Sequence, residues 1–344
     1  MTLQVESPKN IIIRMPNWLG DLVMATPILS DVRRRWPESK ITVMCQSNVA
    51  ALLKEDSDID EVFSFSRPSG WLRRQEERRL IEFLRRGKYD LGILLTNSFS
   101  SAWRFWRGNV RNRVGYSENL RSLFLNKALP WPREKERQHL VVTYKELLPP
   151  LGIALSDTPP RLHVTAQELQ NARQILKKHG TPENGIIIGI NPGAAYGSAK
   201  CWLPERFQEV THRLLANPLI TVVYFGDSTG TPLVNQICSG MPLRVINLAG
   251  ATSLRELIAL IKTCDILLTN DSGPMHIASA VGTKLLALFG STNDVSTGPY
   301  SGGKVIHKHV DCSPCYLRKC PIDFRCMTRI EVDEVYNELQ SLIS

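Results

Sequence analysis

Short runs of aliphatic residues alternate with longer amphipathic stretches along most of the chain. The runs are bounded by polar turns, as expected of strands that are buried on both faces of a parallel sheet. The longer stretches carry apolar residues on one side, which is typical of helices that pack on such a sheet. In the first half, this pattern predicts strands at 10–14, 40–45, 62–65 and 89–95, and helices at 21–36, 50–55 and 71–86.

The alternation pauses after Pro149 and Pro150 and then resumes. Segment 156–160, which ends in two prolines, is the expected linker. The second series predicts strands at 185–191, 221–225, 245–247, 266–268 and 284–289, and helices at 166–179, 204–215, 231–239 and 253–263.

Two such series predict an α/β protein with two Rossmann-like domains, each a doubly wound parallel sheet, that face a central cleft. The length of 344 residues allows each domain to bury a core of its own. We expect the first domain at 1–160 and the second at 161–330. A C-terminal helix is expected at 331–344, where it can pack back on the first domain.

The composition is that of a globular protein, with 43% hydrophobic and 22% charged residues. The chain has no apolar run of about 18 residues, and its N-terminus lacks the regions of a signal peptide, so we expect a cytoplasmic protein. The formal net charge is +9, and arginine clusters such as 33–35 and 85–86 lie in the first half. A basic surface of this kind attracts phosphate, nucleic acid or an anionic membrane.

The richest polar segment follows the predicted strand 266–268 and leads directly into a helix of small residues. It contains Asp271, Ser272, Gly273 and His276. The free N–H groups and positive dipole end of such a helix favour an anionic ligand at the carboxyl end of the strand. The alternative is structural, with Asp271 as the helix N-cap and His276 filling a polar gap.

Other strand ends of the second domain carry polar groups that should reach the same edge of the sheet. Asn191 and Gly193 lead through a glycine-containing loop to Lys200, and Asp227 follows strand 221–225. Small residues let backbone N–H groups approach phosphate, a lysine neutralises it, and an acidic side chain can accept hydrogen bonds from a ribose. Taken alone, the glycine-containing loop with Lys200 could be an ordinary surface loop, and Asp227 could be a helix cap. Together they predict a nucleoside diphosphate site, and neither the dinucleotide fingerprint nor the P-loop motif is present in the sequence.

The first predicted strand also ends in a polar turn, which contains Asn17, Trp18 and Asp21. A carboxylate at this position could take a proton from a substrate hydroxyl within hydrogen-bond reach. It could also cap the following helix, and the two roles are compatible.

Aromatic and cationic side chains are interleaved in the segment 103–107, which includes Arg104. This arrangement suits a sugar ring beside carboxylates, or a membrane interface. Solvated arginines and a buried tryptophan would give the same pattern. The sequence contains no recognisable nucleic-acid-binding module, so we expect no nucleic-acid partner.

Four of the eight cysteines are closely spaced: Cys312, Cys315, Cys320 and Cys326. This spacing is compatible with a tetrahedral thiolate site for zinc or iron. Free thiols are the alternative, because disulfides are rare in a reducing cytoplasm. We favour a structural role, with or without a metal.

Four segments form an ordered set: Asn17-Trp18-Leu19-Gly20-Asp21, Arg113-Val114-Gly115-Tyr116, Asn191-Pro192-Gly193-Ala194 with the stretch 200–204, and Asn270-Asp271-Ser272-Gly273-Pro274-Met275-His276. The set resembles the ADP-heptose:lipopolysaccharide heptosyltransferases, over about residues 11–339, and most closely the members that add the second inner-core heptose. The resemblance implies the GT-B type of fold, heptosyl transfer from ADP-L-glycero-β-D-manno-heptose with inversion, and no catalytic metal or other cofactor.

The resemblance also implies roles for single residues. Asp21 corresponds to the general base and Lys200 to the basic residue at the ADP diphosphate. Asp271, with the N–H groups of Ser272 and Gly273, corresponds to the turn that holds the donor. The remaining donor candidates are Asn191, Gly193, Asp227 as a ribose ligand, and His276 at the diphosphate or as a brace of the turn.

The implied acceptor is heptosyl-Kdo2-lipid A, an anionic glycolipid, which predicts a peripheral enzyme at the inner face of the cytoplasmic membrane. The candidate acceptor-binding residues are Asn17, Trp18, Arg104 and Arg113. One alternative is the same donor with another acceptor, as in heptosyltransferases I and III or protein heptosyltransferases. The other is a non-catalytic nucleotide-sugar-binding protein. A base at Asp21 beside Lys200 and Asp271 argues against it, because a binding protein needs none.

Overall fold

The computed structural model describes residues 7–132, 136–182 and 184–343. The ends of the predicted first and last domains, residues 1–6 and 344, lie outside the described residues. The chain divides into two compact units, Met1–His163 and Val164–Ser344. No helix among the described residues is long and apolar enough to cross a bilayer.

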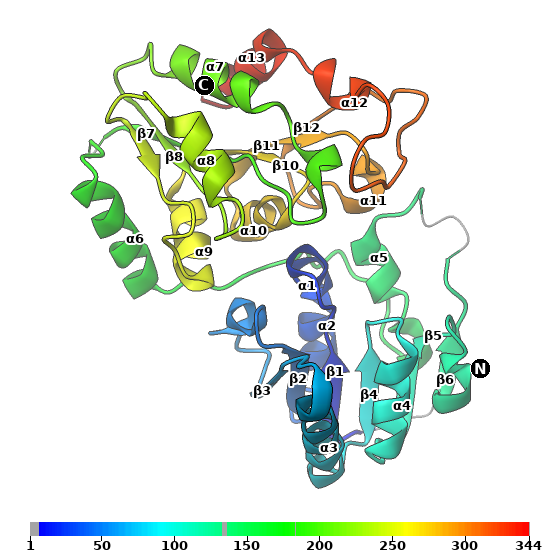
Figure 1. The fold of residues 1–344 in the computed structure, drawn as a ribbon. Coiled ribbons are helices and arrows are strands. Elements are labelled where there is room, and N and C mark those ends of the chain that lie inside the picture. The colour runs from blue at the N-terminus through cyan, green and yellow to red at the C-terminus, as the bar shows by residue number, and fades with distance from the viewer. Residues whose placement is uncertain (1–6, 133–135, 183, 344) are drawn as a thin grey trace. The chain divides into compact units, whose positions relative to one another are not determined.

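The first unit is built on a parallel sheet of six strands in the order β3-β2-β1-β4-β5-β6 (Figure 1). Its central strand β1 is isoleucine-rich and buried. The strands are β1 (Asn10–Arg14), β2 (Lys40–Gln46), β3 (Glu61–Phe65), β4 (Leu91–Leu94), β5 (Asn112–Tyr116) and β6 (Lys127–Leu129). The helices are α1 (Leu19–Ala25), α2 (Pro27–Arg35), α3 (Gly70–Gly87), α4 (Phe99–Arg107) and α5 (Leu140–Lys145), with short 3₁₀ turns at Ala50–Leu53, Arg121–Phe124 and Pro149–Leu151.

The second unit repeats this plan in the order β12-β11-β10-β7-β8-β9. Its strands are β7 (Ile186–Asn191), β8 (Ile220–Tyr224), β9 (Val245–Asn247), β10 (Ile266–Asn270), β11 (Lys284–Phe289) and β12 (Lys304–His307). Its helices are α6 (Ala166–Lys178), α7 (Pro204–Leu214), α8 (Thr231–Cys238), α9 (Leu254–Thr263), α10 (Gly273–Val281), α11 (Asp294–Thr297), α12 (Arg325–Thr328) and α13 (Val332–Ile343), with a 3₁₀ turn at Ser198–Lys200.

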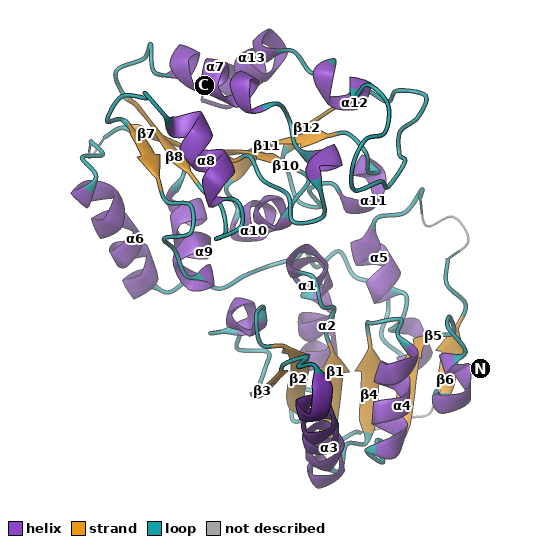
Figure 2. Cartoon of the chain, in the orientation of Figure 1, coloured by secondary structure: helices purple, strands orange, loops and turns teal. Residues whose placement is uncertain are grey.

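Strand order decides where the helices lie. Right-handed crossovers that run in one direction along a sheet place their helices on one face, and crossovers in the other direction use the opposite face. In the second unit, α7 and α8 therefore lie on one face, whereas α9 and α10 lie on the other (Figure 2). The direction reverses between β7 and β10, and in the first unit between β1 and β4. Ligands of doubly wound sheets bind at such reversal points.

The helix expected at 21–36 is divided into α1 and α2. Pro27 has no N–H group, so it cannot donate to the carbonyl of Val23 as a continuing helix requires. The Val23 carbonyl instead accepts from the backbone N–H and the Oγ1 hydroxyl of Thr26, at 3.1 and 2.8 Å. The division ends α1 soon after Asp21.

The C-terminal helix α13 packs on the core of the second unit. Val335 and Leu339 are fully buried in the core of the second unit, in the same cluster as Ile188 and Leu286. The apolar face of α13 is thus used within its own unit, against α7 and the sheet.

Leu339→Ala should destabilise the protein by about 2–5 kcal/mol, because it removes a fully buried side chain and leaves a cavity. Urea unfolding monitored by circular dichroism measures the change. Leu219→Ala is the matched control, because Leu219 is 54% exposed and its truncation should change stability by less than about 0.5 kcal/mol. Equal stability of the two variants would contradict the packing of α13.

Candidate active site

The reversal point of the second sheet brings together two loops that the sequence singles out. Strands β7 and β10 are neighbours, and their connections leave in opposite directions. Asn191, at the end of β7, donates through Nδ2 to the Gly193 carbonyl at 2.9 Å and to the Ser272 hydroxyl at 3.1 Å. Asn270, at the end of β10, donates to the Pro192 carbonyl at 2.7 Å. These amides hold the two loops in a fixed relation at the edge of the sheet.

Lys200 and Asp271 form an ion pair at this edge. The ammonium of Lys200 lies 2.5 Å from Asp271 Oδ2, and the two side chains are 14% and 4% exposed. The Thr292 hydroxyl donates to the same oxygen at 2.6 Å. The structure therefore unites two residues that the sequence places seventy-one positions apart and adds Thr292, which sequence reasoning missed.

Helix α10 begins directly beside this pair. Its N-cap is Ser272, which makes no side-chain cap hydrogen bond, so Asp271 is not the cap that the structural alternative required. The N-terminal amides of a helix carry a partial positive charge. A lysine, a helix start and small residues at one reversal point form an arrangement suited to a diphosphate.

The loop between β12 and α12, residues 308–324, contains three of the four clustered cysteines and is called the cysteine-rich loop. It supports the segment that carries Lys200. The Tyr196 hydroxyl donates to the Tyr316 carbonyl at 2.7 Å, and the Ala199 amide donates to the Arg318 carbonyl at 3.1 Å. A Cβ on Gly197 would lie 2.3 Å from the Arg318 carbonyl oxygen, so this approach requires glycine. These contacts were not predicted, because they join segments with no shared sequence signal.

In the first unit, Asp21 is the third residue of α1, and the N-cap is Trp18, which makes no side-chain cap hydrogen bond. Asp21 is therefore not the N-cap residue of α1, and its charge acts on Tyr144 of α5. Burial raises the pKa of Tyr144 well above its usual value, and the nearby Asp21 carboxylate adds to the rise. Trp18 is 58% exposed.

Arg14, at the end of β1, is a buried cation that sequence reasoning missed. It donates to Asn17 Oδ1 at 2.5 Å and lies over the Phe65 ring. Burial lowers the pKa of Arg14 to about 9, with smaller contributions from the charges of Arg67 and Arg104. Arg14 thus fixes the loop that precedes Asp21, inside a locally basic environment.

Two predicted acceptor-binding arginines already have partners. The guanidinium of Arg104 holds Glu77 through bonds of 2.7 Å and 2.5 Å. Arg113 donates to the carbonyls of Phe124 and Arg111, at 2.5 and 3.0 Å. These contacts hold protein segments together, and binding an acceptor would require the two side chains to use further donors.

Comparison with known proteins identifies the family. Residues 77–324 match the model of glycosyltransferase family 9 (heptosyltransferase). The chain belongs to this family. It is 30% identical to lipopolysaccharide heptosyltransferase 2 of Salmonella typhimurium, over 85% of each chain, and 29% identical to lipooligosaccharide heptosyltransferase 2 of Haemophilus ducreyi, over 97% of this chain and 99% of the relative.

A solved structure extends the likeness to the whole fold. The ADP-heptose lps heptosyltransferase II of E. coli superposes with a TM-score of 0.82 at 26% identity, covering 97% of this chain and 98% of that one. The expected resemblance and the GT-B type of fold, with two Rossmann-like parallel sheets, are confirmed. The family 9 chain is therefore a glycosyltransferase.

The remaining donor candidates of this family 9 enzyme have different surroundings. Asp227 is exposed and accepts from the Gly230 amide at 2.8 Å and the Thr229 hydroxyl at 2.7 Å, as in the turn-capping alternative. His276 is 6% exposed within α10.

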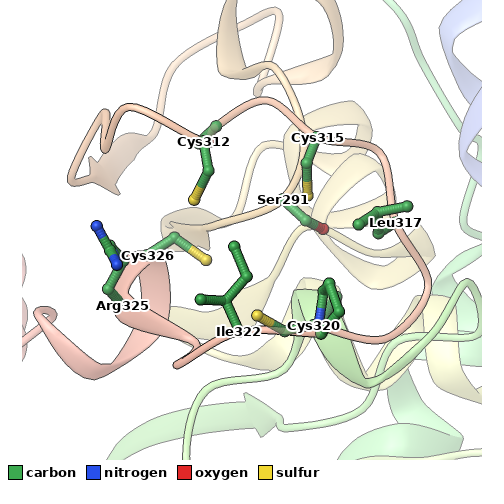
Figure 3. A pocket seen from close by; sticks show the side chains of 11 residues that line it. Ser291, Cys312, Cys315, Leu317, Cys320, Ile322, Arg325 and Cys326 are labelled. Carbon is green, nitrogen blue, oxygen red and sulfur yellow. The ribbon is translucent and has the colours of Figure 1, made fainter.

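The four clustered cysteines of the family 9 chain line one cavity, together with Ser291, Leu317 and Ile322 (Figure 3). Burial, followed by the nearby thiols of Cys312, Cys320 and Cys315, raises the pKa of Cys326 to about 11. Within the described ranges, the group whose ligand atoms all lie within 4.8 Å of one another is Asp294, His307 and His309 rather than the cysteines.

Proposed function

We propose that this enzyme transfers L-glycero-D-manno-heptose from ADP-heptose to heptosyl-Kdo2-lipid A, in the synthesis of the lipopolysaccharide inner core. The observation that carries the proposal is the Lys200–Asp271 pair beside the start of α10, at the reversal point of the second sheet. Family membership and the likeness to an E. coli heptosyltransferase II support the heptosyl donor and the second-heptose acceptor.

Donor binding would use the cationic and small residues at this reversal point. The ammonium of Lys200 and the backbone amides of the N-cap Ser272 and of Gly273, the first residue of α10, would face the negative charge that grows on the leaving diphosphate. Asn191 and Gly193 shape the adjoining loop, and His276 lies in the first turns of the same helix. Asp227 would bind the ribose only if its carboxylate gave up the hydrogen bonds that it accepts from Thr229 and Gly230.

Asp21 would act as the general base. Its carboxylate takes the proton of an acceptor hydroxyl while that oxygen attacks the anomeric carbon of the heptose. The bond from the anomeric carbon to the phosphate oxygen breaks, and ADP leaves with the electron pair, so attack from the opposite face inverts the configuration. Lys200 and the helix start would stabilise the departing charge, which gives a catalytic route that requires no divalent cation.

The acceptor would be recognised through negative charge. Arg14, Arg67 and Arg104 lie close enough for their charges to repel one another, and burial together with the charge of Arg104 lowers the pKa of Arg67. An anion beside these side chains would relieve the repulsion. Exposed Trp18 could contact a sugar ring. An acidic lipid acceptor implies peripheral contact with the inner face of the cytoplasmic membrane.

Release of ADP from ADP-heptose in the presence of EDTA tests this function, with heptosyl-Kdo2-lipid A and Kdo2-lipid A as separate acceptors. We expect turnover on the heptosylated acceptor alone. Turnover on Kdo2-lipid A alone would assign the first heptose instead. Donor binding without turnover on either acceptor would favour another acceptor or a binding protein.

We also propose that Cys312, Cys315, Cys320 and Cys326 hold a structural zinc or iron ion. The shared cavity and the four thiol side chains support this role, and binding would draw the sulfurs closer together. Metal analysis of the purified protein should show less bound metal in Cys315→Ser/Cys320→Ser than in the wild type. Cys238→Ser, outside the cluster, is the control, and equal metal content in all three proteins would contradict the proposal.

A further inference from the structure

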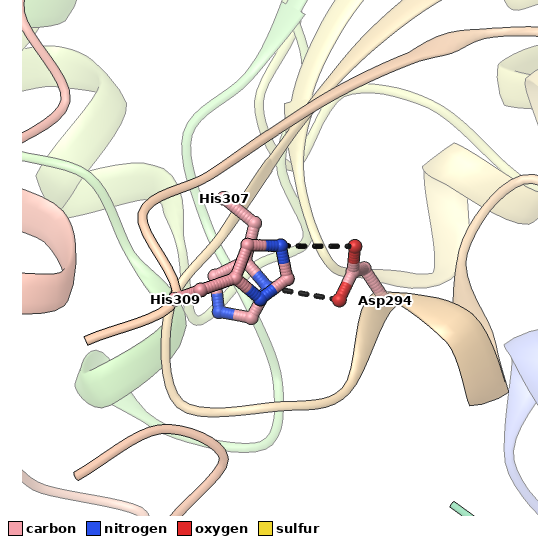
Figure 4. Close-up of side chains that lie close together, drawn as sticks. All are labelled: Asp294, His307 and His309. Carbon is pink, nitrogen blue, oxygen red and sulfur yellow. Dashed lines mark hydrogen bonds and ion pairs between the residues drawn. The ribbon is translucent and has the colours of Figure 1, made fainter. Parts of the chain in front are cut away.

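Three side chains outside the proposed catalytic machinery converge near the edge of the second sheet. Asp294 is the first residue of α11, His307 is the last residue of edge strand β12, and His309 follows two positions later. Their ligand atoms lie within 4.8 Å of one another (Figure 4). His307 Nδ1 is 2.9 Å from Asp294 Oδ1, and His309 Nε2 is 3.8 Å from Asp294 Oδ2.

The hydrogen bonds of His307 indicate that a cation belongs between its Nδ1 atom and the carboxylate of Asp294. The Ser313 hydroxyl donates to the Gly290 carbonyl, so its oxygen accepts from His307 Nε2, 3.0 Å away. A neutral His307 with its proton on Nε2 presents a lone pair at Nδ1, directly toward an anionic oxygen. Two acceptors at this distance repel each other unless a proton or a metal ion lies between them.

We propose that Asp294, His307 and His309 bind a divalent transition-metal ion, with zinc as the best match. Two ligand atoms about 2.0–2.2 Å from a tetrahedral zinc are roughly 3.3 Å apart, and the observed separations of 2.9 and 3.8 Å lie on either side of that value. Two imidazoles with one carboxylate suit zinc better than magnesium or calcium, which prefer oxygen ligands.

The surroundings of the three ligands fit a metal site. The Ser313 hydroxyl fixes the orientation of the His307 ring through Nε2, as the second hydrogen bond of a metal-bound histidine usually does. The His307 side chain is 2% exposed, whereas that of His309 is 66% exposed. The His307 side of the site is therefore buried, and the His309 side is open to solvent. An ion could enter from the open side, and a water molecule could serve there as the fourth ligand.

A zinc ion at this site would tie the end of β12 and the first residues of the cysteine-rich loop to the start of α11. Tyr316 and Arg318 of that loop support the segment that carries Lys200. The ion would act on stability and loop position and take no part in the transfer step. This proposal does not depend on the identity of the donor or the acceptor.

Zinc binding to the full-length protein tests the proposal after endogenous metal is removed with EDTA. Equilibrium dialysis should show that His309→Ala and Asp294→Asn each bind one zinc ion fewer than the wild type. Truncation of His309, which is largely exposed, should leave the fold intact, and Asp294→Asn keeps the size of the side chain. His212→Ala, another exposed histidine in the same unit, should retain the wild-type stoichiometry.

The cysteine cluster is unchanged in all four proteins, so any zinc that it binds cancels in the comparison. Zinc should also raise the Tm of the wild type and of His212→Ala by more than it raises that of the two site variants. Equal stoichiometry and equal Tm shifts in all four proteins would overturn the proposal and leave Asp294 and His307 as an ordinary ion pair.

Discussion

Replacement of Asp21 by asparagine should lower the rate of heptosyl transfer by about 10²–10⁴-fold, the range that a positioned general base contributes. Asparagine keeps the shape of the side chain but cannot accept the proton of the acceptor hydroxyl. Donor binding should be unchanged, because the proposed donor residues belong to the second unit. Single-turnover ADP release measures the chemical step, and titration calorimetry with ADP measures donor binding.

Asp157→Asn is the matched control for Asp21→Asn, because it makes the same change of charge at an exposed position of the first unit. It should retain wild-type transfer. Asp21 also lies in the first turn of α1, where its charge favours the helix, so asparagine should lower stability by at most about 1 kcal/mol. Wild-type transfer by Asp21→Asn would refute the base assignment, whereas unfolding of the variant would be visible by circular dichroism.

Most of the fold could be predicted because buried parallel strands leave a continuous apolar run in the sequence. Strands β5, β6 and β12 were not predicted. Residues of β6 are all half-buried, and β12 lies at a sheet edge with two of its four residues exposed. Such short, partly solvated strands lack a continuous run, and their pairing with neighbours is decided by tertiary contacts.

The candidate site was predictable to the extent that sheet topology determines it. The strand-end rule placed Asp271, Ser272 and Asn191 at one edge, and the structure brings all three together with Lys200. Thr292 could not be predicted, because its bond to Asp271 depends on the path of a loop after β11. The burial of Arg14 was equally hidden, because an arginine at a strand end is indistinguishable in sequence from a solvated one.

Lys200→Met should lower kcat/KM by about 10²–10³-fold, the usual effect of removing one donor that stabilises developing negative charge. It should also destabilise the protein by about 3–5 kcal/mol, because Asp271 is 4% exposed and would keep a buried charge without its cation. The bond from Thr292 to Asp271 moderates this loss of stability. Steady-state kinetics and thermal unfolding measure the two effects separately.

The double variant Lys200→Met/Asp271→Asn distinguishes catalysis from folding. Asparagine removes the unpaired charge, so the Tm should recover toward that of the wild type, while transfer remains low because the diphosphate still lacks its cation. Asp271→Asn alone should lower both stability and transfer by less than Lys200→Met does. Lys200 keeps a polar partner in the amide oxygen, and its ammonium becomes freer to bind the phosphate. Recovery of transfer in the double variant would show that Lys200 serves only to neutralise Asp271, and the diphosphate role would then pass to the amides at the start of α10.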